Sequence, residues 1–292
     1  MLKWLCGRMA LVVVFFISVL PVLQAADLTL AVTAPRGPLE AKKWDVLAKH
    51  LTASVGKSFE IMPFSASQMN DAIGSGHIDF ALVNPVSAAI AVEKKTAKAL
   101  ATMKVDGTTY LAGVIFAKKG GKVQSIADLK GKNVMGYQFG LSAAAYVFQV
   151  YHLKQQGIDA HRDFASFKDA KKQDDIVLAV QTGVIDAGFV KTGILESMAK
   201  EGKIKLEDFV ILDQKKDELD FVHSTDLYPD WFLLAGERVD SAMVAKVKEV
   251  VLKLKPTDEA ATAAKIDGFV EAQSLDTMKA ALKSLKLSPY GG

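Results

Sequence analysis

The chain has 292 residues, of which half are hydrophobic and 24% are charged, and its formal net charge is +3. This length is enough for one large core or for two domains of ordinary size, and the composition is typical of a soluble globular protein. A charge this close to neutral gives no electrostatic reason to bind nucleic acid, so we expect no nucleic-acid partner.

The first 25 residues have the order of a secretory signal peptide. Lys3 and Arg8 precede an uncharged apolar run at 10–20, and small residues follow up to Ala26. The apolar run is shorter than the roughly 20 residues that span a bilayer. A buried N-terminal helix is the alternative, but the charged-then-apolar order favours export, with cleavage near Ala25 or Ala26, and so a periplasmic location.

Removal of residues 1–25 would also change the chemistry of the mature chain. It takes away two cations and no acid, so the formal charge becomes +3 − 2 = +1. It takes away Cys6, the only cysteine, which leaves no disulfide, thiol nucleophile or thiolate metal site. No second apolar span follows, so nothing else in the sequence predicts a membrane anchor.

From residue 28 onward, strand-like and helix-like segments alternate along the chain. Strands are predicted at 28–33, 58–64, 78–83, 97–105, 108–119, 132–137, 163–167, 184–190, 208–213 and 230–237. Helices are predicted at 39–56, 65–76, 85–95, 125–131, 142–157, 172–183, 192–202 and over most of the chain from 241 to the end. This alternation favours an α/β fold with parallel strands in the middle of the sheet.

One pattern, Gly-x-Ile-Asp-x-x-x-Val, occurs twice, at 76–83 and 183–190. It predicts one equivalent strand in each of two lobes, preceded by a helix that ends in glycine. The matched carboxylates, Asp79 and Asp186, could do acid–base work as a pair. Each lies four residues before the end of its strand, however, which favours a structural role in accepting hydrogen bonds from nearby backbone N–H groups.

Polar residues follow the predicted strands of the first half of the chain. In open α/β sheets, ligands lie beyond the carboxyl ends of the strands, where helix starts attract anions. Arg36 follows the strand at 28–33. Asn84-Pro85-Val86-Ser87 follows the strand at 78–83, where Asn84 is a predicted N-cap and Pro85 the first helical residue.

The second half of the chain repeats this arrangement. Ser142 follows the strand at 132–137, and Lys191-Thr192 follows the strand at 184–190. Ser142 and Thr192 are both predicted N-caps. Any one such residue is most often only a cap or a surface charge, but four junctions, two from each half, favour a shared ligand site.

The sequence gives little support for an enzyme or for a metal site. The five histidines share no metal-ligand spacing, and no HExxH, GxSxG or phosphate-loop motif occurs. His50 and His152 are predicted on helix surfaces, and His77 and His161 at loops or strand edges. We therefore expect no catalytic residue, no metal and no cofactor.

The chain resembles the PhnD-like periplasmic solute-binding proteins, a family of the type II clamshell fold associated with the uptake of phosphonates and related oxyanions. The matching motifs, in order, are SGHIDFALVNP, KGKNV, QTGVIDAGFV and STDLYPDWFLLAGE. The resemblance is strongest to a branch that also forms the sensor domain of tetrathionate-sensor-type histidine kinases. Features shared with that branch are PRG at 35–37 with Trp44, NP at 84–85, GVIF at 113–116, VKTGILESMAKEGKI at 190–204, STDLYPDW at 224–231 and the closing LKLSPY.

The chain also departs from the family pattern. Phosphonate binders of the family carry a Ser-Thr-Ser-Gly run where this chain has GLSAAAY at 140–146, so only the hydroxyl of Ser142 remains. Asp174 stands near the position of a ligand histidine. Lys191 stands where the sensor branch often has Arg, which keeps the charge but loses the planar fork. The first two departures, at 140–146 and at Asp174, argue against phosphonate itself as the ligand.

The resemblance implies two α/β lobes joined by two crossover strands that close around a ligand by hinge motion. Residues 1–25 would be the signal peptide, 27–111 with 218–292 lobe one, and 112–217 lobe two. The implied function is capture of a small, anionic solute for an ABC importer by a monomer. Alternatives are presentation of the ligand to a membrane histidine kinase, or an enzyme on the same fold. The implied ligand-binding residues are Arg36, Asn84, Ser87, Ser142, Lys191 and Thr192, with Tyr137, Tyr228 and Trp231 as walls or, alternatively, as core packing.

Overall fold

The computed structural model describes residues 27–34 and 38–291, and residues 1–26, 35–37 and 292 are outside this description. The predicted signal peptide and Arg36 therefore lie outside the described residues. Within the described ranges, no helix is both long and apolar enough to cross a membrane.

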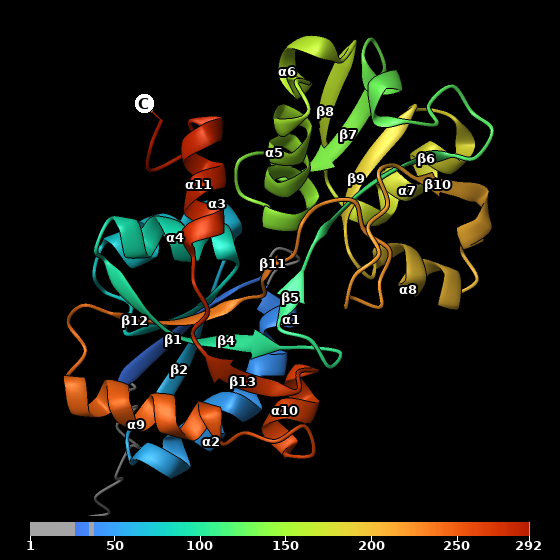
Figure 1. The fold of residues 1–292 in the computed structure, drawn as a ribbon. Helices are drawn as coiled ribbons and strands as arrows, with labels where there is room; N and C mark the ends of the chain where they lie inside the picture. Colours follow the sequence, from blue (N-terminus) through green and yellow to red (C-terminus); the bar gives the residue numbers. More distant parts are fainter. Residues whose placement is uncertain (1–26, 35–37, 292) are drawn as a thin grey trace, which may run out of the picture.

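The chain forms two α/β lobes with a thin connection between them (Figure 1). Lobe one, as named here, carries a six-stranded sheet of order β13-β4-β12-β3-β1-β2. Its strands are β1 (Leu28–Thr33), β2 (Phe59–Phe64), β3 (Phe80–Val83), β4 (Ala97–Lys104), β12 (Phe232–Gly236) and β13 (Gly268–Glu271). Its helices are α1 (Pro38–Ala41), η1 (Lys42–Trp44), α2 (Asp45–Val55), α3 (Ala66–Gly74), α4 (Pro85–Glu93), α9 (Ser241–Leu252), α10 (Glu259–Ala264) and α11 (Asp276–Leu285).

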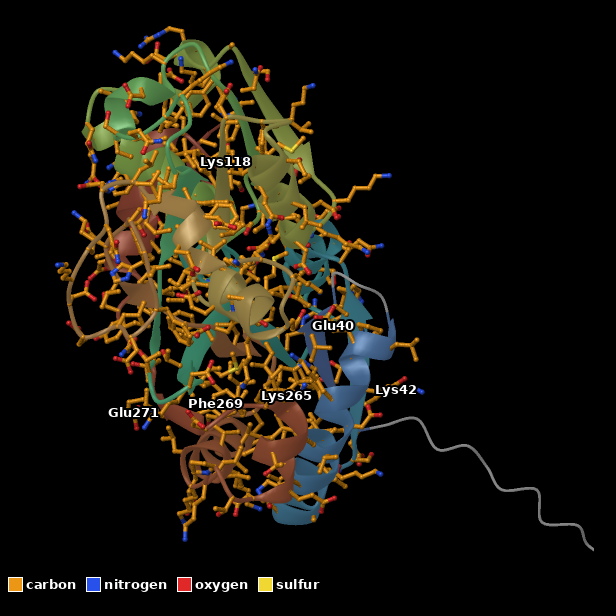
Figure 2. All side chains as sticks on the ribbon, turned by 90° about the vertical axis from the view of Figure 1, so that its right-hand side faces the viewer. Glu40, Lys42, Lys118, Lys265, Phe269 and Glu271 are labelled. Atoms are coloured by element: carbon orange, nitrogen blue, oxygen red, sulfur yellow. The ribbon has the colours of Figure 1, made fainter. Side chains whose placement is uncertain are left out.

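Lobe two carries a five-stranded sheet of order β10-β6-β9-β7-β8. Its strands are β6 (Gly113–Lys118), β7 (Asn133–Tyr137), β8 (Ser166–Ala170), β9 (Ala187–Lys191) and β10 (Phe209–Ile211). Its helices are η2 (Ile126–Leu129), the π-helical turn η3 (Ala143–Val147), α5 (Phe148–Gln155), α6 (Ala160–Asp163), α7 (Gln173–Thr182), α8 (Ile194–Lys200) and η4 (Leu206–Asp208). Figure 2 shows Lys118 of β6 on this lobe, and Lys265 and Glu271 near β13 on lobe one.

Helices cover both faces of each sheet. Because successive side chains of a strand point to opposite faces, each strand contributes to the core on both sides. In β1, Leu30 and Val32 face a core cluster with α2, α9 and α10, whereas Ala31 faces a cluster with α3, α4 and α11. The second of these clusters continues into lobe two, where it includes Phe148 of α5 and Phe189 of β9. The other face of the lobe-two sheet packs against α7 and α8. One of the three hydrophobic clusters therefore extends through both lobes, and each of the other two lies within one lobe.

Both sheets are mixed rather than parallel, which corrects the prediction. The strands β1, β2 and β3 are parallel, but β12 runs antiparallel to β3 and β4. The chain returns to lobe one at the edge facing lobe two, so β12 starts where β3 ends and must run the other way. The strand β13 was missed, because its four residues lie in a segment predicted to be mostly helical.

The connection between the lobes consists of two segments that cross together. The strand predicted at 108–119 divides at Ala112 into β5 (Tyr110–Leu111) and β6, and β5 pairs antiparallel with β11 (Tyr228–Pro229). Toward lobe two, hydroxyl groups continue the pairing: the N–H of Ile115 donates to Oγ of Ser224 at 2.8 Å. The N–H of Gly113 donates to Oγ1 of Thr225 at 2.9 Å.

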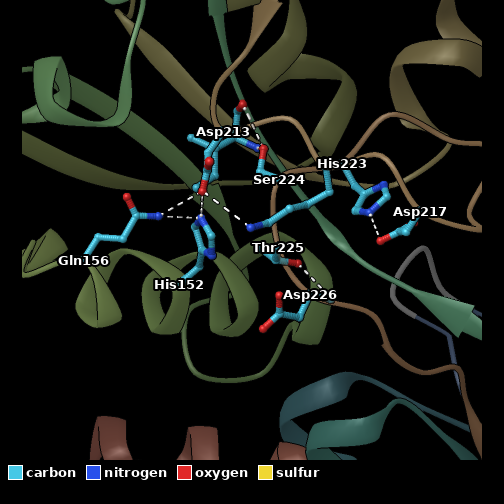
Figure 3. A network of polar contacts seen from close by, with 10 residues as sticks. His152, Gln156, Asp213, Asp217, His223, Ser224, Thr225 and Asp226 are labelled. Atoms are coloured by element: carbon cyan, nitrogen blue, oxygen red, sulfur yellow. Dashed lines mark hydrogen bonds and ion pairs between the residues drawn. The ribbon is translucent and has the colours of Figure 1, made fainter.

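The return segment is also held by two histidine–carboxylate pairs (Figure 3). His152 of α5 contacts Asp213 at 2.7 Å, and His223 contacts Asp217 at 3.0 Å. His152 is buried, which corrects its predicted place on a helix surface. Nε2 of His152 lies within hydrogen-bond distance of both the carboxylate of Asp213 and the side chain of Gln156, so this ring nitrogen is paired despite its burial.

The aspartates of the two copies of the repeated motif form equivalent hydrogen bonds in the two lobes. The N–H of Thr29, at the start of β1, donates to Oδ2 of Asp79 at 2.8 Å. The N–H of Asn133, at the start of β7, donates to Oδ2 of Asp186 at 2.9 Å. The predicted structural role of the two carboxylates is therefore confirmed, with partners on the neighbouring strand.

Candidate ligand site between the lobes

Several predicted site residues lie at the strand ends where the lobes face each other. Asn84 follows β3, and Trp231 precedes β12, whose first residue Phe232 pairs with Val83. Asn84 and Trp231 are therefore neighbours at the edge of the lobe-one sheet. In lobe two, Lys191 ends β9 and pairs with Gly113, where the first crossing segment enters β6.

Asn84 caps α4, as predicted. Its Oδ1 accepts from the N–H of Val86 at 2.9 Å and from the N–H of Ser87 at 3.2 Å, with Pro85 in the first turn. The side chain of Ser87 is buried. The first N–H groups of α4 are thus already satisfied within the protein, which leaves this helix start with little to offer an anion.

The helix that follows β7 begins differently. Ser142 occupies the predicted N-cap position, but its hydroxyl forms no capping hydrogen bond. The first turn is π-helical, with the N–H of Val147 donating to the carbonyl of Ser142 at 3.1 Å. This wider turn displaces the N–H groups that a serine side chain would reach, and π-turns are frequent at functional sites.

Thr192 is also not a cap, because Gly193 with φ of 83° is the residue that precedes α8. The ladder between β6 and β9 continues past its last strand pair and engages Thr192 instead. The N–H of Thr192 donates to the carbonyl of Ala112 at 3.1 Å, and the N–H of Ala112 donates to Oγ1 of Thr192 at 3.5 Å. The buried threonine therefore ties β9 to the crossing segment.

Asp230, next to Trp231, is a buried carboxylate that the sequence did not single out as a candidate site residue. Burial raises the pKa of its carboxyl to about 6, and the charge of Lys191 and the N–H of Trp231 offset part of this effect. Lys191 is exposed and comes from the opposite lobe, and its charge acts on Asp230 across the interface. Among the ion pairs of the described residues, none joins them. The available signal was an acid within the apolar stretch YPDWF.

The three predicted aromatic walls have different surroundings. Tyr228 is buried and stacks on Phe148, with ring centroids 3.7 Å apart and an interplanar angle of 9°. Desolvation raises the pKa of its hydroxyl. Trp231 is partly buried against both core clusters of lobe one, and Tyr137 is partly buried against the core of lobe two. Tyr228 thus packs at the junction of the lobes, and the other two retain exposed surface.

The lobes touch at the loop that precedes η3. The Nδ2 group of Asn84 donates to the carbonyl of Leu141 at 3.2 Å. Asp169, at the end of β8, holds the loop by accepting from the N–H groups of Gln138 at 2.7 Å and Phe139 at 3.2 Å. The ring of Phe139 stacks on Tyr146 and packs on Phe167.

The arrangement can bind a small polar molecule by hydrogen bonds and charge. The strand ends on this side of the two lobes carry an exposed cation, a buried carboxylate, a helix start and the hydroxyl of Ser142, which makes no capping bond among the described residues. Over the residues that the structure covers, no group of three or more His, Cys, Asp or Glu side chains could hold a metal ion.

Comparisons with known proteins agree with this reading of the fold. Residues 32–277 match the family described as "ABC transporter, phosphonate, periplasmic substrate-binding protein". The tetrathionate sensor histidine kinase TtrS of Salmonella typhimurium is 27% identical over 230 residues, which are 76% of this chain and 39% of that protein. The chain therefore spans about two fifths of the length of this curated relative.

Solved structures share the two-lobed architecture. XAC2383 from Xanthomonas citri, bound to ATP, has a TM-score of 0.74 at 16% identity, over 89% of this chain and 98% of that one. PhnD1 from Prochlorococcus marinus, in complex with methylphosphonate, has a TM-score of 0.70 at 15% identity, over 88% and 97%. The predicted type II clamshell is thus confirmed. The family consists of binding proteins rather than enzymes, and the chain belongs to the periplasmic substrate-binding proteins of phosphonate ABC transporters.

Proposed function

We propose that this protein captures a small anion between its lobes and delivers it to an ABC importer. The observation that carries the proposal is the start of the helix formed by η3 and α5, beyond the carboxyl end of β7. Ser142 makes no capping bond there. The first N–H groups of a helix, here those of Ala143 and Ala144, have no intrahelical acceptor and carry partial positive charge, which attracts anions.

Lys191 supplies the formal positive charge in this proposal, and Arg36 adds a second from lobe one. A lysine ammonium is a point charge rather than a planar fork, so it favours a compact anion without demanding a bidentate geometry. Trp231 and Tyr137, with exposed surface on opposite lobes, form walls. Asn84, Ser87, Thr192 and Tyr228 contribute mainly by shaping the site, since their contacts are largely within the protein.

The buried carboxylate of Asp230 restricts which anions the proposed site would bind. At pH 7 a carboxyl with a pKa of about 6 is mostly ionised, and it repels an anion that carries no proton. It accepts a hydrogen bond from a protonated oxyanion or from a donor group on the ligand. The preferred ligand is therefore an oxyanion that carries at least one donor, in preference to a fully ionised one such as sulfate.

The named ligands of related proteins suggest which compounds to test first. PhnD1 binds methylphosphonate and the related kinase is a tetrathionate sensor, so phosphorus and sulfur oxyanions are the first compounds to test. The single serine in GLSAAAY, where phosphonate binders of the family have Ser-Thr-Ser-Gly, favours a ligand that needs fewer donors than a phosphonate dianion. We also propose that the monomer is the working form and that residues 1–25 are removed on export.

Two measurements test this proposal. Mass spectrometry of the denatured protein identifies any small molecule that copurifies. A thermal-shift screen then compares phosphate, phosphite, phosphonates, sulfur oxyanions and carboxylates. We expect an oxyanion to raise the melting temperature, because a ligand that binds only the native state stabilises it by mass action. If no anion in the screen stabilises the protein, the anion proposal is refuted.

The similarity to a sensor kinase supports a second candidate function, which is signalling instead of uptake. In this alternative, the loaded protein presents its ligand to a membrane histidine kinase instead of a permease. Capture of partners from detergent-solubilised membranes, with and without the identified ligand, separates the two outputs. A permease on the loaded protein supports uptake, and a kinase supports sensing.

A further inference from the structure

We infer that Asn84 is a latch between the lobes, which holds them together through its Nδ2 group, rather than a direct ligand contact. Its donor reaches the carbonyl of Leu141, 57 residues away in the chain and in the other lobe, at 3.2 Å. The inference rests on the proposed function only where it links closure to ligand capture.

The cap fixes the orientation of the Asn84 side chain. Oδ1 accepts from two backbone N–H groups at the start of α4. An N–H group cannot donate to an amide nitrogen, so rotating the carboxamide by 180° would break both bonds. Nδ2 is therefore directed away from α4. Asp, Ser and Thr would cap this helix about as well, but none of them has an N–H group at the position of Nδ2.

The acceptor is held in place as firmly as the donor. Gln138 has a φ of 49°, in the left-handed region, and its carbonyl accepts from the N–H groups of Leu141 at 3.0 Å and Ser142 at 2.9 Å. Asp169 secures the same turn through two backbone N–H groups. The carbonyl of Leu141 is thus presented by a closed, side-chain-braced turn rather than by a free loop.

Further contacts lie along the same edge of the interface. Nζ of Lys154 in α5 donates to the carbonyl of Ser284 in α11, and Leu287 packs against the same hydrophobic cluster as Phe139 of the braced turn. The hydrogen bond of Asn84 therefore belongs to a continuous contact between the lobes, and it is made where the two sheets' strand ends meet.

The latch is coupled to the ligand site by covalent connection. The accepting carbonyl belongs to the peptide that joins Leu141 to Ser142, and Ser142 starts the helix to which we assign the anion. A ligand that binds both Ser142 and lobe one holds the acceptor close to Asn84, so it favours the closed latch. By the reciprocity of linked equilibria, closing the latch then strengthens ligand binding by the same factor.

Spin labels measure the latch directly. They are attached through Lys49→Cys in α2 and Lys168→Cys in β8, both exposed positions in different lobes, with Cys6→Ser in the same chain. Pulsed dipolar spectroscopy gives the distance distribution for protein denatured and refolded without copurified small molecules. Asn84→Asp keeps the cap, removes the donor and sets an oxygen against the carbonyl. Asn84→Ser keeps the cap and cannot reach across.

The closed-to-open ratio should fall about fivefold in Asn84→Ser, the effect of one neutral hydrogen bond, and further in Asn84→Asp. Asp240→Asn is the matched control, since it exchanges the same two residue types at the cap of α9 and should leave the ratio unchanged. An unchanged ratio in Asn84→Ser, or an equal fall in Asp240→Asn, overturns the latch. These ratios need no ligand, so a failed anion screen does not affect them.

Discussion

Replacement of Asp230 by asparagine should remove a pH-dependent cost to the folded state. The pKa of its carboxyl is raised from 3.8 to about 6 by burial, a difference of about two pH units. At about 1.4 kcal/mol per unit, this amounts to about 3 kcal/mol. The asparagine has nearly the same shape, and its Oδ1 can still accept from the N–H of Trp231, as the carboxylate does at 2.6 Å.

The sign follows from proton binding. Below pH 3.8 the carboxyl is protonated in both the folded and the unfolded chain, and it costs nothing. Between pH 3.8 and about 6 it ionises in the unfolded chain first, so the stability of the wild type falls and then levels off above pH 6. Relative to the wild type, Asp230→Asn should gain about 3 kcal/mol of unfolding free energy between pH 3.5 and pH 7.

Urea unfolding of both proteins at half-unit pH intervals measures this difference. Asp226→Asn, at an exposed position of the same segment, serves as the control for loss of one acid. A stability difference between Asp230→Asn and the wild type that does not change with pH would show that this carboxyl is not destabilised by burial.

Three further predictions concern the site and the hinge. Lys191→Gln should weaken the binding of any stabilising anion about tenfold and reduce its salt dependence in calorimetry, because it removes the exposed charge; equal affinity would exclude Lys191 from the site. Ser142→Ala should weaken binding about tenfold while the melting temperature stays constant, because no capping bond is lost; a stability loss with unchanged affinity would contradict this. Ser224→Ala should lower the unfolding free energy by about 1–3 kcal/mol in urea titrations, since the buried N–H of Ile115 loses its acceptor; a loss near zero would mean that water replaces the hydroxyl.

Much of the fold could be predicted from the sequence, because local patterns produce it. The cap at Asn84 followed from Asn-Pro after a buried strand, and the roles of Asp79 and Asp186 followed from their place in the repeated motif. The predicted caps at Ser142 and Thr192 failed for another reason. At Ser142 a π-helical first turn replaces the expected α-helical one, and at Thr192 a backbone ladder to Ala112, 80 residues away, holds the residue outside the helix.

Parts of the site lie beyond what local patterns show. The burial of Asp230 and its proximity to Lys191 require that two segments from opposite lobes come together. The contact of Asn84 with Leu141 likewise exists only in the assembled molecule. The ligand-binding roles of the predicted residues and the lobe boundaries at 111/112 and 217/218 remain predictions.

Each lobe has one aspartate of the repeated motif, and this aspartate lies at the opposite side of the sheet from the candidate ligand site. Asp79 and Asp186 tie neighbouring strands where those strands begin, at the far side of each sheet from the other lobe. Ser142, Lys191 and Asp230 come after strands or before a returning one, at the opposite side. Substitutions there leave the ties intact. The side of each sheet that faces the other lobe can therefore be redesigned for a new ligand while both aspartates of the motif are kept.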